Sequence, residues 1–219
     1  MAVLTVDNLH LRYGDNPILK GVSMALQPGE VVSLLGPSGS GKTTLLRAVA
    51  GLEQPHEGTI RIGERVVFDG AQKVELPAEK RDLGLVFQSY ALWPHRTVVD
   101  NVAYGLKLRK VSADEVKARV QSVLDQLGLG ALGGRFPHEL SGGQQQRVAI
   151  ARAIITDPTL IVADEPTGDL DRTTGGEILA LLERLNDDLG KTIIMVTHDP
   201  KAAERAHRLV HLEKGVLVD

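Results

Sequence analysis

The chain has 219 residues, of which 42% are hydrophobic and 24% are charged, as expected for a globular protein with one domain or one domain with an inserted lobe. The formal net charge of −3 gives no reason to expect a nucleic-acid partner, and the absence of cysteine excludes disulfides and cysteine-ligated metals. No basic segment precedes a long apolar stretch, and no run of about 18 apolar residues occurs, so the sequence predicts neither a signal peptide nor a membrane span. Any role at a membrane is therefore expected to depend on a partner.

The first part of the chain is predicted to be mainly β-structure. Alternating or buried apolar runs, separated by glycine and proline, predict strands over residues 3–11, 18–26, 31–35, 59–62, 66–69 and 83–87. One helix is expected over residues 42–50, directly after the buried strand 31–35, with Gly51 as its end.

The middle of the chain is predicted to be helical. Ser112 and Glu115 have the spacing of a capping box, and apolar residues repeat behind them at helical spacing. These apolar residues are Val116, Val120, Leu124 and Leu127. A second long helix is expected over residues 142–155.

The last third of the chain is predicted to alternate between strands and a helix. Residues 160–163 and 192–196 form buried strands, and one apolar helix face lies between them. The residues of that face are Ile178, Leu181, Leu182, Leu185 and Leu189. Such alternation indicates an α/β fold with parallel strands. We expect a single domain over residues 1–219, in which 1–88 and 158–219 form the core and 89–157 an inserted helical lobe.

The loop after the strand 31–35 matches the P-loop pattern without a mismatch. Its sequence from Gly36 to Thr43 is Gly-Pro-Ser-Gly-Ser-Gly-Lys-Thr. Glycines let the backbone approach a polyphosphate closely, and the following helix points its N-terminus at the anion. Lys42 is expected on the β- and γ-phosphates, and the Thr43 hydroxyl on Mg²⁺. The predicted nucleotide-binding residues are Gly36, Pro37, Ser38, Gly39, Ser40, Gly41, Lys42, Thr43 and Thr44.

Two carboxylates end the apolar strand at residues 160–163. Asp164 is expected to hold the Mg²⁺ shell, and Glu165, one residue later, to act as the general base on the attacking water. Alone, two acids at a strand end would more simply be solvated. After a P-loop, and followed by Pro166, they favour a catalytic site.

The segment Leu140–Gln144, Leu-Ser-Gly-Gly-Gln, resembles the signature of ABC ATPases. With the P-loop and the acidic pair, the resemblance covers essentially the whole chain. It implies a P-loop NTPase core with an antiparallel β subdomain and an inserted α-helical subdomain, with ATP and Mg²⁺ as cofactors. It also implies a head-to-tail dimer in which Ser141, Gly142, Gly143 and Gln144 serve the ATP of the opposite subunit. From the residues alone, Ser-Gly-Gly before a helix is a capped turn whose amides can bind an anion.

Four further positions are assigned through the same resemblance. Tyr13 would stack on adenine, although a core or surface tyrosine is the local alternative. Gln88 would touch the Mg²⁺ and water site and report to the membrane domain. Asp171 would align the two subunits, although a simple helix N-cap explains it equally well. His198 would contact the γ-phosphate. The expected catalytic set is therefore Lys42, Gln88, Glu165 and His198, and the expected metal set is Thr43, Gln88 and Asp164.

Two parts of the chain indicate different transport directions. Residues 79–95, continuing to 101–105, resemble bacterial importers of sugars, polyamines, ferric iron and oxyanions, whose subunits usually carry a C-terminal regulatory β-domain that is absent from these 219 residues. Residues 164–171 and 198–203 instead resemble the short cassettes of lipoprotein-releasing and macrolide-type exporters. Because the family docks its membrane partner after Gln88, import is favoured.

The resemblance also implies partners and a location. The chain is expected to lie peripherally on the cytoplasmic face of the inner membrane, bound to transmembrane permease subunits and, for an importer, working with a substrate-binding protein. The surface around Gln88, Tyr90, Leu92 and Trp93 is expected to receive a short helix of the permease. The alternative is that Trp93 packs inside the helical lobe.

Two other classes of function are disfavoured by the sequence. A soluble ABC ATPase acting on DNA or ribosomes would carry a long coiled coil between Lys42 and Asp164, or a second cassette, and the sequence has neither. Its acidic balance also disfavours nucleic acid. A nucleotide-binding regulator without hydrolytic activity is disfavoured by the presence of Glu165 and His198.

Overall fold

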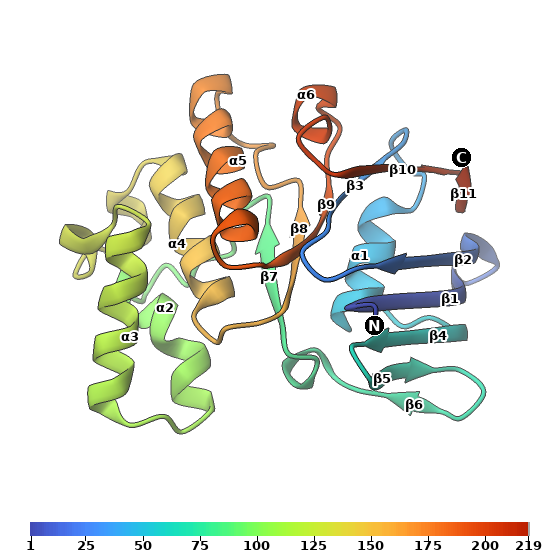
Figure 1. The fold of residues 1–219 in the computed structure, drawn as a ribbon, viewed down its shortest axis with the longest axis horizontal. Helices are drawn as coiled ribbons and strands as arrows, with labels where there is room; N and C mark the ends of the chain where they lie inside the picture. Colours follow the sequence, from blue (N-terminus) through green and yellow to red (C-terminus); the bar gives the residue numbers. More distant parts are fainter. Residues whose placement is uncertain (219) are drawn as a thin grey trace.

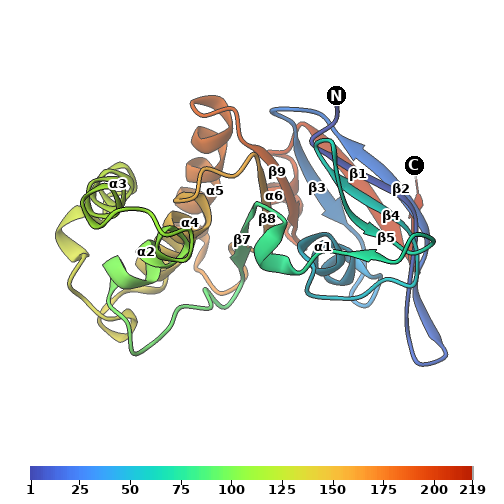
Figure 2. The ribbon, with the colours of Figure 1, turned by 90° about the horizontal axis from the view of Figure 1, so that it is seen from below.

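The computed structural model describes residues 1–218 and contains two sheets with helix α1 between them (Figures 1 and 2). The first sheet is antiparallel, with the strand order β2-β1-β4-β5-β6. Its strands are β1 (Leu4–Tyr13), β2 (Asn16–Leu26), β4 (Glu57–Ile62), β5 (Arg65–Asp69) and β6 (Val74–Glu75). The second sheet has the order β11-β10-β3-β9-β8-β7 and is parallel except for β11. Its strands are β3 (Val31–Leu35), β7 (Leu83–Phe87), β8 (Leu160–Asp164), β9 (Thr192–Val196), β10 (Arg208–Glu213) and β11 (Val216–Val218). The predicted α/β class, including its antiparallel part, is confirmed.

The helices divide between the two faces of the second sheet and a lobe beside it (Figure 1). They are α1 (Lys42–Ala50), α2 (Val98–Leu108), α3 (Ala113–Gln126), α4 (Gly142–Ile154), α5 (Arg172–Asp187) and α6 (Pro200–Ala203). Short 3-10 turns lie at residues 78–80, 130–132 and 137–139. Within residues 1–218, none of the helices is long and apolar enough to cross a bilayer.

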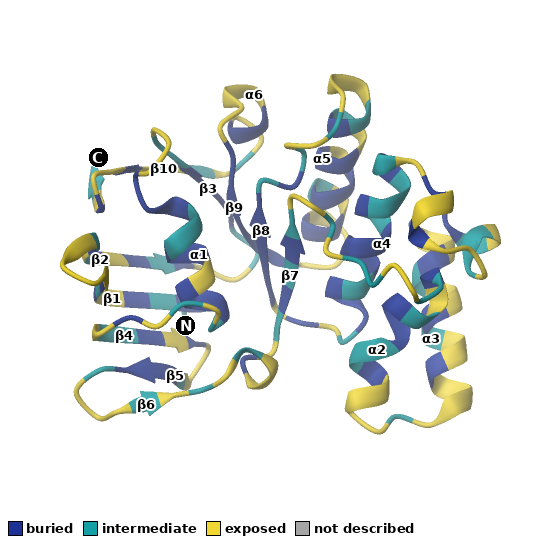
Figure 3. Ribbon diagram, turned by 180° about the vertical axis from the view of Figure 1, so that it is seen from behind, coloured by how far each residue is buried: buried dark blue, intermediate teal, exposed yellow. Residues whose placement is uncertain are grey.

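The central strands of the second sheet are buried on both faces, as Figure 3 shows. Along β8, Leu160 and Val162 join the core around α1, whereas Ile161 and Ala163 join the core formed with α4 and α5. Burial on both faces explains why this strand is a continuous apolar run rather than an alternating one. The same run ends in Asp164, which is thereby brought to the edge of the sheet.

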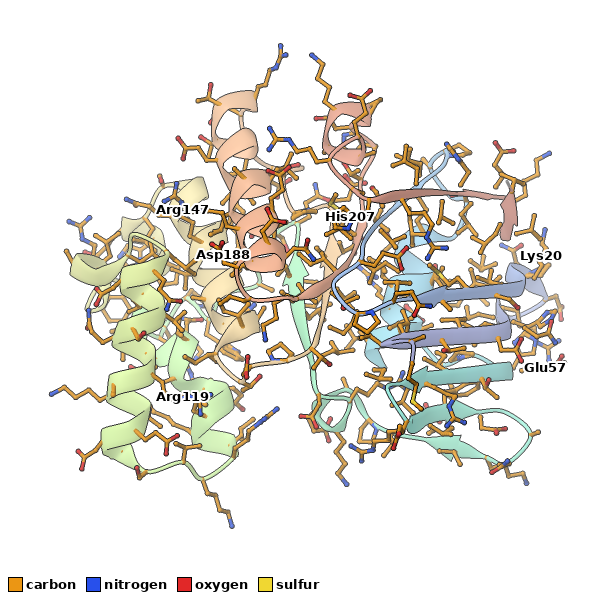
Figure 4. The ribbon with its side chains drawn as sticks, in the orientation of Figure 1. Lys20, Glu57, Arg119, Arg147, Asp188 and His207 are labelled. Carbon is orange, nitrogen blue, oxygen red and sulfur yellow. The ribbon has the colours of Figure 1, made fainter. Side chains whose placement is uncertain are left out.

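The helical lobe differs in two details from the sequence prediction. The Ser112 hydroxyl accepts from the backbone N–H of Glu115, but the reciprocal half of the expected capping box is missing, because the Glu115 carboxylate instead pairs with Arg119 at 3.3 Å. The helix expected over residues 142–155 ends at Ile154. Arg119 of α3 donates to the carbonyl oxygen of Ile155, and Arg147 of α4 donates to Glu177 of α5, so the lobe helices are tied to one another and to the core. Figure 4 labels Arg119 and Arg147 on these helices.

The functional segments follow strands that end at one edge of the parallel sheet. The P-loop follows β3, Gln88 follows β7, Glu165 follows β8, and His198 lies two residues after β9. In open α/β sheets this carboxyl edge is where ligands bind. The topology therefore gathers residues that are far apart in the sequence.

Candidate active site

The loop between β3 and α1 is shaped as an anion site. Gly36 has φ of 150°, and a Cβ there would lie 2.1 Å from the carbonyl oxygen of Leu212, so only glycine fits. Lys42, the first residue of α1, is only 8% exposed. Its ammonium group donates to the carbonyl oxygens of Gly36 (2.7 Å) and Pro37 (3.0 Å) and lies 3.5 Å from the Ser40 hydroxyl. A cation and the positive end of a helix thus meet at this loop.

The P-loop borders a cavity of about 450 Å³, which we call the P-loop cavity. Its lining consists of Ile18, Gly36, Ser38, Gly39, Gly41, Lys42, Thr43, Thr44, Glu165 and His198. Most of the predicted phosphate-binding residues therefore share one space with the predicted base and the predicted γ-phosphate contact.

The predicted metal residues Thr43 and Asp164 are in direct contact. The Thr43 hydroxyl donates to Asp164 Oδ1 at 3.0 Å, and Arg47 lies 3.9 Å from the other carboxylate oxygen. A hydroxyl and a carboxylate are the hard oxygen donors that Mg²⁺ takes together with nucleotide phosphates, so these residues fit that ion. Among residues 1–218 no three histidine or acidic side chains cluster as a metal site made of protein ligands alone.

Glu165 is held in an unusual backbone conformation. Its φ of 51° lies in the left-handed region, which costs a non-glycine residue free energy. Its N–H donates to the carbonyl oxygen of Val196 at 3.0 Å, and its own carbonyl oxygen accepts from Gly168 at 3.0 Å. Its carboxylate is hydrogen-bonded to Nδ1 of His198. The predicted base is thus oriented by an imidazole and by strand β9.

Gln88 lies at the same sheet edge, and its side chain bonds to Asp169. In β7 and β8, Phe87 pairs with Asp164, so Gln88 follows directly alongside Glu165. Its amide donates to Asp169 Oδ1 at 2.7 Å, and its side chain lies against Gly168. Its assigned contact with the metal remains a prediction.

Tyr13 lies beside the P-loop helix. Its ring is 50% exposed, and its hydroxyl lies next to Glu53 and Thr44. Partial burial, followed by the hydrogen bond with Glu53, raises the pKa of this phenol, so it stays neutral at physiological pH. An exposed neutral ring near Thr44 can stack on a base, as its assigned role requires.

The signature residues begin helix α4 and pack tightly. Ser141 is the N-cap: its hydroxyl accepts from the N–H of Gln144, and the Gln144 side chain accepts from the N–H of Ser141. A Cβ on Gly142 would lie 2.9 Å from the Tyr90 hydroxyl, and one on Gly143 would lie 2.4 Å from Thr174 Cγ2. Within residues 1–218, the lining of the P-loop cavity includes no signature residue.

Asp171 caps helix α5. Its carboxylate accepts from the backbone N–H groups of Thr173 and Thr174 and from the Thr174 hydroxyl at 2.6 Å. These hydrogen bonds, that from the Thr174 hydroxyl first, lower the pKa of Asp171. The N-cap alternative is therefore correct for this chain, and a role between subunits remains a prediction.

Sequence reasoning missed three polar residues around the site, two of which are buried. Arg81 is 2% exposed and binds the end of α1, and Gln146 is fully buried on α4. Arg152 donates to the carbonyl oxygens of Tyr90 (3.0 Å) and Ala91 (2.6 Å), both of which have positive φ. In a single sequence, glutamine and arginine on helices or near turns are ordinarily exposed, so no local signal marked them.

Known proteins resemble this chain in both sequence and structure. Residues 19–168 match the model of the ABC transporter family. The sulfate/thiosulfate import ATP-binding protein CysA of Mycolicibacterium paratuberculosis is 45% identical over 97% of the chain and 57% of its own length. The trehalose/maltose import ATP-binding protein MalK of Thermococcus litoralis is 46% identical over 94% of the chain and 55% of its own length. The chain thus spans little more than half the length of these curated relatives.

A solved structure extends the comparison. The dimeric bacterial ABC transporter cassette MJ0796 has a TM-score of 0.84 and 36% identity, and the match covers 99% of this chain and 97% of that cassette. A family match over residues 19–168 exceeds half of the chain, and the similarity in sequence and in fold agrees with it. The chain belongs to the ABC transporter family.

Proposed function

We propose that this chain binds Mg·ATP and hydrolyses it to power solute transport through separate transmembrane subunits. The observation that carries the proposal is the P-loop cavity, where Lys42 and Thr43 share one space with Glu165 and His198. Asp164 is joined to Thr43 beside it. Phosphate cradle, metal donors and base are thus within one site, as phosphoryl transfer to water requires.

The binding residues each have a defined task in this proposal. The loop amides and Lys42 hold the β- and γ-phosphates, and Tyr13 stacks on adenine. Thr43 and Asp164 would hold Mg²⁺, with Gln88 as a further contact. The ion would supply neutralisation of the charge that develops during transfer of the phosphoryl group.

The hydrolytic step then belongs to Glu165 and His198. Water attacks the γ-phosphorus while the Glu165 carboxylate accepts its proton, and the bond to the β,γ-bridging oxygen breaks to release ADP. The imidazole of His198 hydrogen-bonds to the Glu165 carboxylate and so orients the base. The same imidazole borders the P-loop cavity, in which the γ-phosphate would lie. A positioned base contributes about 10² to 10⁴ in rate.

The active form is proposed to be a head-to-tail dimer. Ser141 and the first amides of α4 form an anion-binding helix end. In the described chain this end does not border the P-loop cavity, and so is free to serve the nucleotide of a second copy. The cassette MJ0796, which matches over nearly its whole length, is dimeric, and a second structure of it is a post-hydrolysis dimer with ADP and Pi.

A groove between the core and the lobe is proposed as the place where the permease binds. This docking groove, of about 510 Å³, is lined on the lobe side by Trp93, Tyr104 and Arg152. The Trp93 ring lies 4.6 Å from that of Tyr104, with the guanidinium groups of Arg96 and Arg152 each 5.2 Å from its centre. Trp93 is thus packed against the lobe while it also borders the groove, so its packing is compatible with the proposed docking.

The direction is proposed to be import. The curated relatives CysA and MalK are named as import ATP-binding proteins, in agreement with the importer-like segment at residues 79–95. The chain would then lie peripherally at the cytoplasmic face of the inner membrane, with permease subunits and a substrate-binding protein as partners. An exporter of the lipoprotein-releasing type is the alternative that the test below distinguishes.

Two measurements test this function. Purified protein should hydrolyse ATP only when Mg²⁺ is added, and a Glu165→Gln variant should bind ATP but lose hydrolysis. Copies with cysteine at position 91, where an exposed alanine borders the docking groove, should crosslink to a permease purified with the chain. In vesicles, transport should require a binding protein on the side opposite to ATP. If the wild-type protein does not hydrolyse ATP, the proposed ATPase activity is rejected. If the solute is transported away from the side that holds ATP, only the proposed import direction is rejected.

A further inference from the structure

Gln146 lies one turn into the signature helix and is completely buried. Its side chain leaves the helix toward the parallel sheet rather than toward solvent. The Nε2 group donates to the carbonyl oxygen of Pro166 at 2.5 Å and to that of Phe87 at 3.3 Å. One amide of helix α4 therefore binds the last residue of β7 and the segment that directly follows β8.

The two carbonyls belong to the neighbours of predicted catalytic residues. Pro166 directly follows Glu165, and Phe87 directly precedes Gln88. In β7 and β8 these positions lie side by side, since Phe87 pairs with Asp164. Gln146 thus holds the backbone one residue away from each of the two predicted catalytic residues, Glu165 and Gln88.

The orientation of the amide is fixed by its partners. Both nearby groups are acceptors, so the NH₂ end must face them, and the Oε1 atom is left buried without a hydrogen-bond partner. An unpartnered buried acceptor is unfavourable, and native structures contain few of them. A methionine would fill the same space without this penalty, so the distinctive contribution of glutamine here is the donor to the two strand ends.

The conformation of Glu165 is especially sensitive to how firmly its backbone is held. Its left-handed conformation persists only where its surroundings over-determine it. Three contacts have already been described: with Val196, with Gly168 and with His198. The bond from Gln146 to Pro166 is the contact that comes from the helical lobe.

We propose that Gln146 is a positioning residue for ATP hydrolysis, which holds the backbone that aims Glu165 and fixes it to the signature helix. The inference rests on the proposed hydrolytic function. Helix α4 starts with the signature, so it presents Ser141 to the nucleotide bound by the partner subunit. Through Gln146, the same helix also positions the general base Glu165 of its own chain. Gln146 therefore acts on the site of its own chain, whereas Ser141 acts on the opposite one.

The test uses Gln146→Met, which keeps length and apolar volume but removes the donor. The matched control is Gln145→Met, on the same helix, because within residues 1–218 the Gln145 amide donates only to the carbonyl oxygen of Leu140. A misplaced catalytic group costs up to about 100-fold. We expect single-turnover ATP hydrolysis to fall about 10- to 100-fold in Gln146→Met and to change less than about twofold in Gln145→Met, with the Kd for ATP unchanged in both.

Mixed dimers identify which site is affected. Two differently tagged copies are assembled with ATP, purified through both tags and started with Mg²⁺. In one arrangement the first copy carries Gln146→Met and the second carries Glu165→Gln, so the remaining active site depends on the altered copy's own base. In the other arrangement both changes are on the same copy. The remaining active site then has the P-loop and Glu165 of the unaltered copy and takes only the signature from the altered copy. We expect the rate to fall in the first arrangement alone.

The outcomes separate the inference from the function on which it rests. Absence of hydrolysis by wild-type protein would reject the proposed function. Given wild-type hydrolysis, the inference is overturned if Gln146→Met matches Gln145→Met, or if the loss follows the opposite site. It is also overturned if the ATP Kd rises along with the loss of rate or the variant fails to fold, since either result assigns Gln146 a general structural role.

Discussion

Arg81 joins the far end of the P-loop helix to the segment that leads into β7. Its Nη1 donates to the carbonyl oxygens of Ala48 (2.8 Å) and Val49 (2.9 Å) in the last turn of α1, and its Nε donates to that of Leu76 (2.8 Å). A cation at a helix C-terminus also complements the helix dipole. Burial lowers the pKa of Arg81, although the guanidinium stays charged in the physiological range.

Replacing Arg81 with methionine should destabilise the fold strongly. Hydrogen bonds to a charged group contribute about 1.5–3 kcal/mol each, and the change removes three of them. Part of this loss is offset, because methionine avoids the cost of burying the guanidinium, which is several kcal/mol. We expect the free energy of unfolding to fall by about 3 kcal/mol, a large part of the stability of a typical domain.

The assay is urea unfolding followed by far-UV circular dichroism. Arg65→Met is the matched control, because Arg65 also donates to a backbone carbonyl oxygen, that of Lys80 at 2.9 Å, but is exposed. The control should change stability by less than about 0.5 kcal/mol. Saturation with ATP at about 100 times its Kd should restore about 2.7 kcal/mol to Arg81→Met if the P-loop still binds. Equal unfolding midpoints for Arg81→Met and Arg65→Met would refute the reasoning.

Four other changes have definite expected outcomes. Lys42→Ala should weaken ATP binding about 10- to 100-fold in calorimetric titration, because it removes the charged donor at the loop; an unchanged Kd would contradict the P-loop assignment. Glu165→Gln should lower single-turnover hydrolysis by about 10² to 10⁴ and form dimers with ATP, as seen by light scattering; wild-type hydrolysis would place the base elsewhere. Gly143→Ala should cost about 1–3 kcal/mol of stability, since its Cβ would lie 2.4 Å from Thr174 Cγ2. Gly176→Ala, with open space around its Cβ, should instead stabilise α5 by up to about 1 kcal/mol in thermal unfolding, and a lower stability would argue against this packing.

The buried strands and the P-loop helix could be predicted from the sequence because their signals are local. The strands 31–35 and 192–196 were predicted with the bounds they have in the structure, and α1 likewise spans Lys42–Ala50. Apolar runs buried on both faces, a loop motif and Gly51 after the helix each determine structure within a few residues. In such segments the local sequence largely determines the secondary structure, and distant contacts alter it little.

Other elements depend on contacts that a single sequence does not reveal. β6 has two residues, and β10 is a strand through its parallel pairing with β3, roughly 175 residues earlier in the chain. The capping box expected at Ser112 formed only in part, because Arg119 competes for the Glu115 carboxylate at the i,i+4 position.

The residues of the candidate site likewise differ in whether local sequence or distant contacts determine their roles. Lys42, Thr43 and the acidic pair could be predicted as site residues because each belongs to a contiguous motif. Gln146, however, acquires its role from the two strand ends that α4 crosses, and Arg152 from a loop sixty-odd residues earlier. Burial of a polar side chain is a tertiary property, so periodicity does not predict it.

The packing of Trp93 has a spectroscopic consequence. It is the single tryptophan in the sequence, and its ring is fixed in the docking groove by Tyr104 and two arginines. Its backbone is also fixed, because both its N–H and its carbonyl oxygen bond to the side chain of Asn101. Its intrinsic emission therefore reports on one defined surface, with no background from a second indole. A segment that enters the groove would exclude water from this ring and shift its emission to shorter wavelength, so occupancy could be followed in real time without an attached label.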